Sequence, residues 1–139
     1  MFFCSTEAQL ISGTKIAPDY RNELRVDVEQ WVKAGHRRPH LVAILVGEDP
    51  ASQKYVHNKM LAAKDVGIDS ETLKLPATAS EKEILAKIDE LNKNPNVDGI
   101  LVQLPVPQHV NERNVCNAVD PRKDVDGFHI INVGKLSLN

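Results

Sequence analysis

Continuous apolar runs alternate with longer amphipathic segments along this chain. Leu41–Gly47 and Val97–Pro105 have strand length and are almost entirely apolar, which is typical of parallel strands covered on both faces. The segment Glu71–Leu75, which ends at Pro76, predicts a shorter third strand. Strands that alternate with helices indicate an α/β fold of three layers, in which a mostly parallel sheet lies between helices on both faces.

Apolar residues recur at helical spacing between and beyond these strands. Ser80 and Glu83 form a capping box at the start of one such segment, and Gly67 supplies a stop for another. Helices are predicted over 18–34, 49–67, 80–94 and 111–119. Residues 1–15 are expected to form a lead-in strand or turn, and the acidic, turn-rich tail is expected to lead into a last apolar segment.

The predicted helix that opens at Asp49 and Pro50 places three functional groups on one stripe. Residues three and four apart share a helix face, so Ser52, Tyr55 and Lys59 are expected to point toward the sheet together. An inward lysine extends its amine to solvent, finds a partner or gives up its charge, because burying an unpaired charge is costly. Extension to solvent is the commoner outcome, but a hydroxyl, a phenol and an amine on one stripe favour a functional site.

Gln103 is a polar interruption near the carboxyl end of the second apolar run. Ligands of open parallel sheets bind at the edge where strands end and the following helices begin. The amine of Lys59 and the amide of Gln103 are therefore expected to converge at that edge.

Composition limits the alternatives. With 139 residues, 42% of them apolar and 26% charged, the chain is expected to form one domain, and its net charge of −2 argues against a nucleic-acid surface. Cys4 and Cys116 lie too far apart to indicate a disulfide framework or a zinc site, and Cys116 is interpreted as a small core residue. No apolar run reaches the roughly 20 residues of a membrane span, and MFFCSTEA is too short for a targeting segment.

Several site patterns are not matched. The chain has neither of the glycine-rich phosphate-binding patterns and no nucleophile elbow. Asp120, Asp124 and Asp126 do not have the spacing of a calcium-binding loop, and Asp126 before Gly127 is equally compatible with a simple turn acid. The basic stretch 36–40 is interpreted as a solvated loop, with contact to an anionic ligand as the weaker alternative.

Three blocks resemble the methylenetetrahydrofolate dehydrogenase/cyclohydrolase family: PASQKYVHNK (50–59), GILVQLPVP (99–107) and KDVDGFHIINVG (123–134). The resemblance covers residues 10–134, and FHIINVG is most similar to the NAD-dependent mitochondrial members. It implies that residues 1–139 form the family's catalytic domain. The family's second domain, a Rossmann domain that binds NAD or NADP, has no counterpart here, either because the sequence is a fragment or because the natural product is short.

The resemblance also implies roles for particular residues. Lys59 corresponds to the family's central catalytic lysine, with Tyr55 and Gln103 as its catalytic neighbours. Tyr55, Gln103, Asp126 and, in support, Ser52 correspond to substrate-binding positions, with Asp126 on the pterin. The associated hypothesis is a neutral or proton-sharing Lys59 that is oriented by a hydrogen bond from Gln103. No cofactor-binding or metal-binding residue is assigned in this chain.

The implied activity is oxidation of 5,10-methylenetetrahydrofolate with NAD or NADP, followed by hydrolysis of the methenyl product to 10-formyltetrahydrofolate. A homodimer of the complete protein and a mitochondrial location, or otherwise a cytoplasmic one, are expected, with no nucleic-acid or membrane partner. Roles for magnesium and phosphate stay open. Two alternatives remain: a truncated, non-catalytic folate-binding or dimerising module, and a flavodoxin-like interaction domain in which Lys59 only extends to solvent. The apolar tail IINVGKLSL is expected to be exposed.

Overall fold

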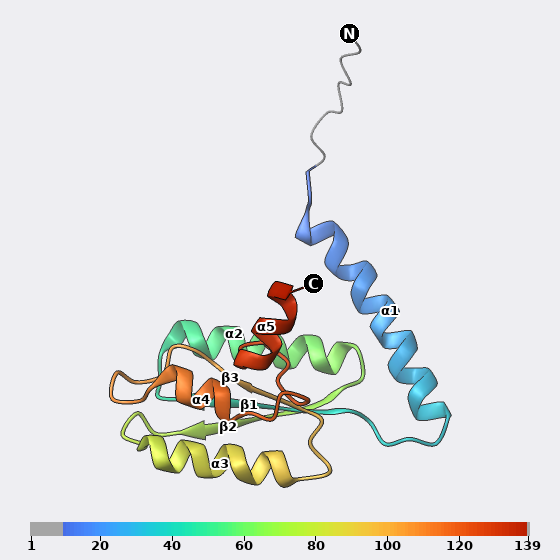
Figure 1. Ribbon diagram of the computed structural model, residues 1–139. Coiled ribbons are helices and arrows are strands. Elements are labelled where there is room, and N and C mark those ends of the chain that lie inside the picture. Colours follow the sequence, from blue (N-terminus) through green and yellow to red (C-terminus); the bar gives the residue numbers. More distant parts are fainter. Residues whose placement is uncertain (1–9, 139) are drawn as a thin grey trace.

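The computed structural model describes residues 10–138 and shows a three-layer α/β body from which two helices extend (Figure 1). Residues 1–9, with Cys4 and most of the predicted lead-in segment, lie outside the described residues. The element order is α1 (Gly13–Lys33), β1 (His40–Val46), α2 (Pro50–Asp65), β2 (Asp69–Leu75), α3 (Glu81–Lys93), β3 (Gly99–Val102), α4 (Glu112–Ala118) and α5 (Ile130–Leu138). The predicted α/β class is confirmed.

The sheet is parallel, with β1 in the centre and the order β2-β1-β3. Side chains alternate between its faces. One face of β1, with Val42 and Ile44, packs into a cluster that includes Ile88 of α3 and Val115 of α4. The other face packs against α2 through a cluster made of Ala43, Leu45, Val56 and Leu101. Helices on both faces explain why the β1 run is continuously apolar.

Three elements begin two residues or more away from their predicted starts, and one of them, β2, predicted over Glu71–Leu75, begins at Asp69. The helix predicted over 18–34 begins at Gly13, because Pro18 near its start removes only one backbone donor and does not end it. Residues 13–15 are therefore helical rather than part of a lead-in strand. The strand predicted over 97–105 shortens to Gly99–Val102, because Asp98 binds Arg37 and the amide of His40, and Pro105 has no N–H for the ladder.

The basic stretch 36–40 is a structural connection rather than a free loop. The Arg37 guanidinium donates to both carboxylate oxygens of Asp98 at 2.6 and 2.9 Å, and Arg38 donates to the carbonyl of Gly67 at 2.8 Å. The ring of His36 stacks on Trp31 at 3.9 Å. These side chains join the start of β1 to neighbouring loops, which leaves little support for an anion site.

Helices α1 and α5 project from the body on the same side (Figure 1). α1 is tied to α2 by Arg25, which donates to the carboxylate and the backbone carbonyl of Asp65 at 3.0 Å each. α5 has no buried residue, and Leu136 and Leu138 are more than four-fifths exposed, as expected for the apolar tail. Within the described residues, no helix combines the length and the apolar character needed to cross a bilayer.

Candidate active site

Helix α2 begins where the sequence predicts, and its first turn is closed by its own cap. The Asp49 carboxylate accepts a 2.7 Å hydrogen bond from the backbone N–H of Ser52, and Pro50 occupies the first turn. Hydrogen bonds from Ser52 hold the pKa of Asp49 below its ordinary value. Because a carboxylate already occupies this helix N-terminus, a dinucleotide phosphate does not fit there.

The predicted stripe of Ser52, Tyr55 and Lys59 is only partly turned toward the sheet. Ser52 is 3% exposed, whereas Tyr55 is 64% exposed, so the prediction of an inward phenol is wrong. A residue three positions further along a helix is rotated by roughly 60° from its starting point, which puts Tyr55 at the edge of the packed face. The side chain of Lys59 is intermediate, with 39% of its surface exposed.

Lys59 has a partner from a distant part of the chain. Its Nζ lies 3.5 Å from Oδ1 of Asp126, whose side chain is 23% exposed. Of the three outcomes open to an inward lysine, the structure therefore shows the second. A pair this exposed contributes about 1 kcal/mol or less to stability. Its significance is that it places a cation and an anion side by side at a partly shielded position.

Gln103 lies directly after β3. Its backbone N–H donates to the carbonyl of Ile44 at 2.9 Å, which continues the ladder, so the strand alternation puts its side chain on the face of Leu101 that α2 covers. Its Nε2 donates to the carbonyl of Leu104 at 2.8 Å, and no hydrogen bond to Lys59 occurs among the described residues. Its Oε1 is buried and finds no donor within residues 10–138. An orphaned buried acceptor is costly, and because this oxygen is buried, a ligand would reach it only after the Gln103 side chain turns.

The three acids of the tail have separate partners. Asp120 pairs with Arg122 at 2.7 Å, and this hydrogen bond lowers the pKa of Asp120 to about 2. Asp124 accepts the backbone N–H groups of Gly127 and His129, and Asp126 faces Lys59. Across residues 10–138, no three His, Cys, Asp or Glu side chains are grouped in a way that would hold a metal ion.

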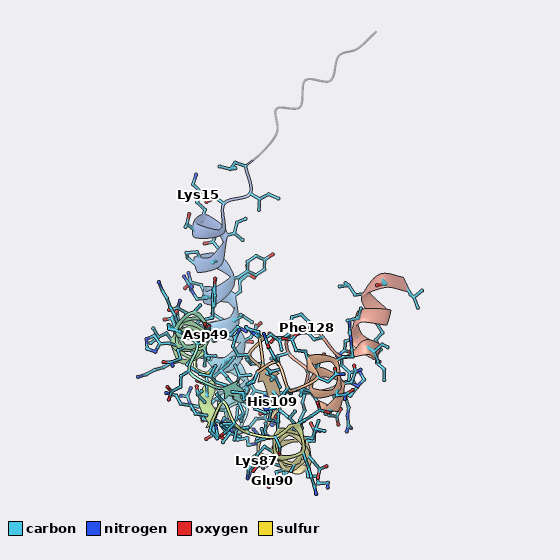
Figure 2. All side chains as sticks on the ribbon, turned by 90° about the vertical axis from the view of Figure 1, so that its left-hand side faces the viewer. Lys15, Asp49, Lys87, Glu90, His109 and Phe128 are labelled. Carbon is cyan, nitrogen blue, oxygen red and sulfur yellow. The ribbon has the colours of Figure 1, made fainter. Side chains whose placement is uncertain are left out.

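A groove of about 480 Å³ lies between the segment after β3, α4 and the start of α5, and none of Lys59, Gln103 and Asp126 lines it. Its lining includes Leu104 and Phe128, and Phe128 is labelled on the side of the body from which α1 and α5 project (Figure 2). Cys116, which also lines it, is 9% exposed, and burial raises the pKa of its thiol, so the prediction of a small core residue is confirmed. The sequence reasoning missed Phe128, although a large aromatic residue directly after a turn glycine was a signal.

The comparison with known families agrees with this arrangement. The model for the tetrahydrofolate dehydrogenase/cyclohydrolase catalytic domain matches residues 11–126, a range that includes both Lys59 and Asp126. The chain belongs to this family. The resemblance inferred from the three sequence blocks is therefore confirmed.

The relatives of this tetrahydrofolate dehydrogenase/cyclohydrolase chain are more than twice its length. It is 59% identical over 133 residues to the mitochondrial bifunctional methylenetetrahydrofolate dehydrogenase/cyclohydrolase of Gallus gallus, covering 96% of this chain and 40% of that protein. The Drosophila melanogaster protein of the same description is 54% identical over 139 residues, which is 100% of this chain and 45% of that protein. A solved 5,10-methylenetetrahydrofolate dehydrogenase from the silkworm, Bombyx mori, superimposes with a TM-score of 0.91 at 48% identity, over 95% of this chain and 46% of that one.

Proposed function

We propose that this chain is the catalytic, folate-binding part of an enzyme that oxidises 5,10-methylenetetrahydrofolate and hydrolyses the methenyl product to 10-formyltetrahydrofolate. The observation on which this depends is the contact of Lys59 with Asp126 at 3.5 Å. The two residues belong to separate blocks of the family resemblance, and the fold brings them together.

The side chains suggest a division of roles. Asp126 is an acceptor for the amino and ring N–H groups of a pterin, and the buried Oε1 of Gln103 is a second acceptor. Lys59 is the group that moves protons, at the attacking water or at the folate nitrogens. Tyr55, which is 64% exposed, offers a ring face on which a flat ligand can stack. Ser52 is buried one turn before Tyr55 and supports this end of α2.

A nicotinamide dinucleotide would accept the hydride in the oxidation step. The described residues do not fit it, since the α2 N-terminus is occupied by Asp49 and no glycine-rich turn precedes this helix. We therefore assign the dinucleotide to a further domain, in keeping with relatives more than twice as long. The choice between NAD and NADP, and any use of magnesium or phosphate, is not assigned to residues of this chain.

Lys59→Met tests the proposal, because it keeps an unbranched side chain of similar length and removes the amine. In a protein that joins this chain to a dinucleotide-binding domain of the family, the variant should lower the rate of methenyltetrahydrofolate hydrolysis by at least about 100-fold. Lys54→Met is the matched control, because Lys54 lies on the solvent face of the same helix. An unchanged rate for Lys59→Met would remove the lysine from the proposed role.

A non-catalytic folate-binding or dimerising module is the second candidate, and the exposed apolar side chains of α5 favour it. Ile130 and Ile131 are at least half exposed, as are Leu136 and Leu138, which is unusual for a surface that meets only water. Analytical ultracentrifugation of the 139-residue chain, with and without a folate, separates the candidates. A stable dimer that binds folate but supports no hydrolysis would favour the module.

The location and the partners are also proposals. Relatives described as mitochondrial, from Gallus gallus and Drosophila melanogaster, support a mitochondrial location, with the cytoplasm as the alternative. The proposed small-molecule partner is a reduced folate, and the proposed protein partner is a second copy of the complete enzyme. No nucleic-acid or membrane partner is proposed.

A further inference from the structure

The turn that presents Asp126 is held by a second acid, Asp124, whose carboxylate accepts hydrogen bonds from the protein itself. Its Oδ1 accepts the backbone N–H of Gly127 at 3.1 Å, and its Oδ2 accepts the backbone N–H of His129 at 2.9 Å. The Nδ2 of Asn132 donates to the same Oδ2 at 2.9 Å. We propose that Asp124 is the positioning residue for Asp126, setting the separation of Asp126 from Lys59 on which the proposed folate binding rests.

The backbone of Asp124 is fixed independently of its side chain. Asp124 forms an isolated parallel bridge with Ile100 of β3, which is fully buried. The N–H of Ile100 donates to the carbonyl of Lys123 at 2.7 Å, and the N–H of Val125 returns a bond to the carbonyl of Ile100 at 3.4 Å. Asp124 and Val125, the two residues before Asp126, are therefore attached to the sheet.

The approach to this bridge is held from the other side of the body. The Lys123 ammonium donates to the carbonyls of Leu91, Asn92 and Asn94 at the C-terminal end of α3, at 3.0, 2.8 and 2.8 Å. Lys123, which precedes the turn, is thus bound to α3. Gly127 and His129, which follow Asp126, are bound to the Asp124 carboxylate. Asp126 lies between these two attachments, so its position depends on both.

The charge state of Asp124 suits this role. Burial by itself raises the pKa of Asp124, but the hydrogen bonds from Asn132 and from the backbone of His129, Phe128 and Gly127 outweigh it and leave the pKa below its ordinary value. A carboxylate that already accepts these donors has little capacity left for a ligand. Asp124 therefore acts on the site through Asp126 and not by contact with the substrate.

The link also extends to α5. Asn132 lies in the first turn of that helix, and its Nδ2 donates to the carbonyl of Pro121 as well as to Asp124, each at 2.9 Å. Removing this amide takes one donor from Asp124 without changing any charge. Asn132→Ala is therefore a milder perturbation of the hydrogen bonds around Asp124 than Asp124→Asn.

The test uses the 139-residue chain with ¹³C,¹⁵N-labelled lysine, and it follows the side-chain NMR signal of Lys59 without any ligand. Asp126→Asn defines the signal of a lysine that has lost its partner. Asp124→Asn should move the Lys59 signal by more than about half of that difference, and Asn132→Ala should move it in the same direction by less, because the turn loosens. Asp120→Asn is the control, since it removes an acid of the same segment that pairs with Arg122, and it should leave the signal in place.

Folate affinity is the second readout, measured by titration calorimetry at a temperature at which all variants are folded. Asp124→Asn should weaken binding by about tenfold or more, the scale expected when a binding group is misplaced, and Asp120→Asn should not. A Lys59 signal that stays at the wild-type position in folded Asp124→Asn, or in Asn132→Ala if the first variant does not fold, overturns the positioning role. Failure of the wild-type chain to bind folate would count against the proposed function alone, because the NMR comparison needs no ligand.

Discussion

Gly99, at the start of β3, lies against the turn that carries Asp126, and its replacement by alanine gives a sharp prediction. A Cβ at Gly99 would lie 2.7 Å from Cγ1 of Val125 and 3.2 Å from Cδ1 of Leu41. Carbon atoms in ordinary contact are about 3.5–4.0 Å apart, so the Val125 methyl would have to retreat by about 0.8 Å or more. Val125 is β-branched and has few rotamers with which to do so.

Two opposing contributions set the size of the effect on stability. Overpacking of this kind costs about 1–3 kcal/mol, whereas replacing glycine with alanine gains about 0.4–1 kcal/mol by restricting the unfolded chain. Val125 is 54% exposed and can shift outward, which favours the lower half of the range. We expect a net loss of up to about 1.6 kcal/mol, or a melting temperature lower by up to about 6 °C.

Thermal and urea unfolding followed by circular dichroism measure this loss. Gly13→Ala is the matched control, because a Cβ there meets nothing within 4 Å and the residue also lacks a positive φ. In a double-mutant cycle, the cost of Gly99→Ala should largely disappear in a Val125→Ala background. A cost that is the same in both backgrounds, or an increase in melting temperature, would refute the steric argument.

The same substitution should also disturb the site. Val125 lies between Asp124 and Asp126, so an outward shift of its side chain pulls on the turn that faces Lys59. We expect weaker folate binding in Gly99→Ala and near-normal binding in Gly99→Ala/Val125→Ala. A loss of stability without any change in folate affinity would show that packing at Gly99 does not affect the position of the turn.

Two further predictions concern the fold. The pKa of Asp120 in the folded chain is about 2, below its ordinary 3.8. The stabilising effect of the Asp120 carboxylate is therefore complete above about pH 4 and is lost as the pH falls toward 2. Urea unfolding between pH 5 and pH 2 should show this decline in unfolding free energy, and Asp120→Asn should make the decline smaller. Ile88→Ala removes a fully buried α3 side chain and should cost about 2–5 kcal/mol, while the exposed substitution Glu90→Ala should change the unfolding free energy by less than about 0.5 kcal/mol.

The elements that the sequence predicted well are those whose cause is local. The capping box of Ser80 and Glu83 is present with both of its bonds, and Asp49 caps α2 as expected. The continuous apolar run of β1 follows from burial on both faces, which any parallel strand with helices on each side requires. In each case, residues within one or two turns of each other contain the whole signal.

Exposure at the edge of a helix face could not be predicted in this way. Tyr55 and Val56 are adjacent, yet Val56 is 3% exposed and Tyr55 is 64% exposed. Helical spacing gives the angle between side chains, but the rotation of the helix against the sheet is set by tertiary packing. The same limit applies to Arg37, because β1, α2, β2 and α3 separate it in the sequence from its partner Asp98.

The pairing of Lys59 with Asp126 illustrates what spacing leaves open. Sequence pattern indicated that Lys59 faces inward and that Asp126 precedes a turn glycine, and Gly127 indeed has a φ of +70°. The meeting of the two depends on attachments that come from the end of α3, from β3 and from the first turn of α5, through Lys123, Asp124 and Asn132. No local window contains all of these, so the geometry of the site is a property of the assembled fold. Substitutions at Lys123, Asp124 or Asn132 should therefore alter the Lys59–Asp126 contact without changing either partner.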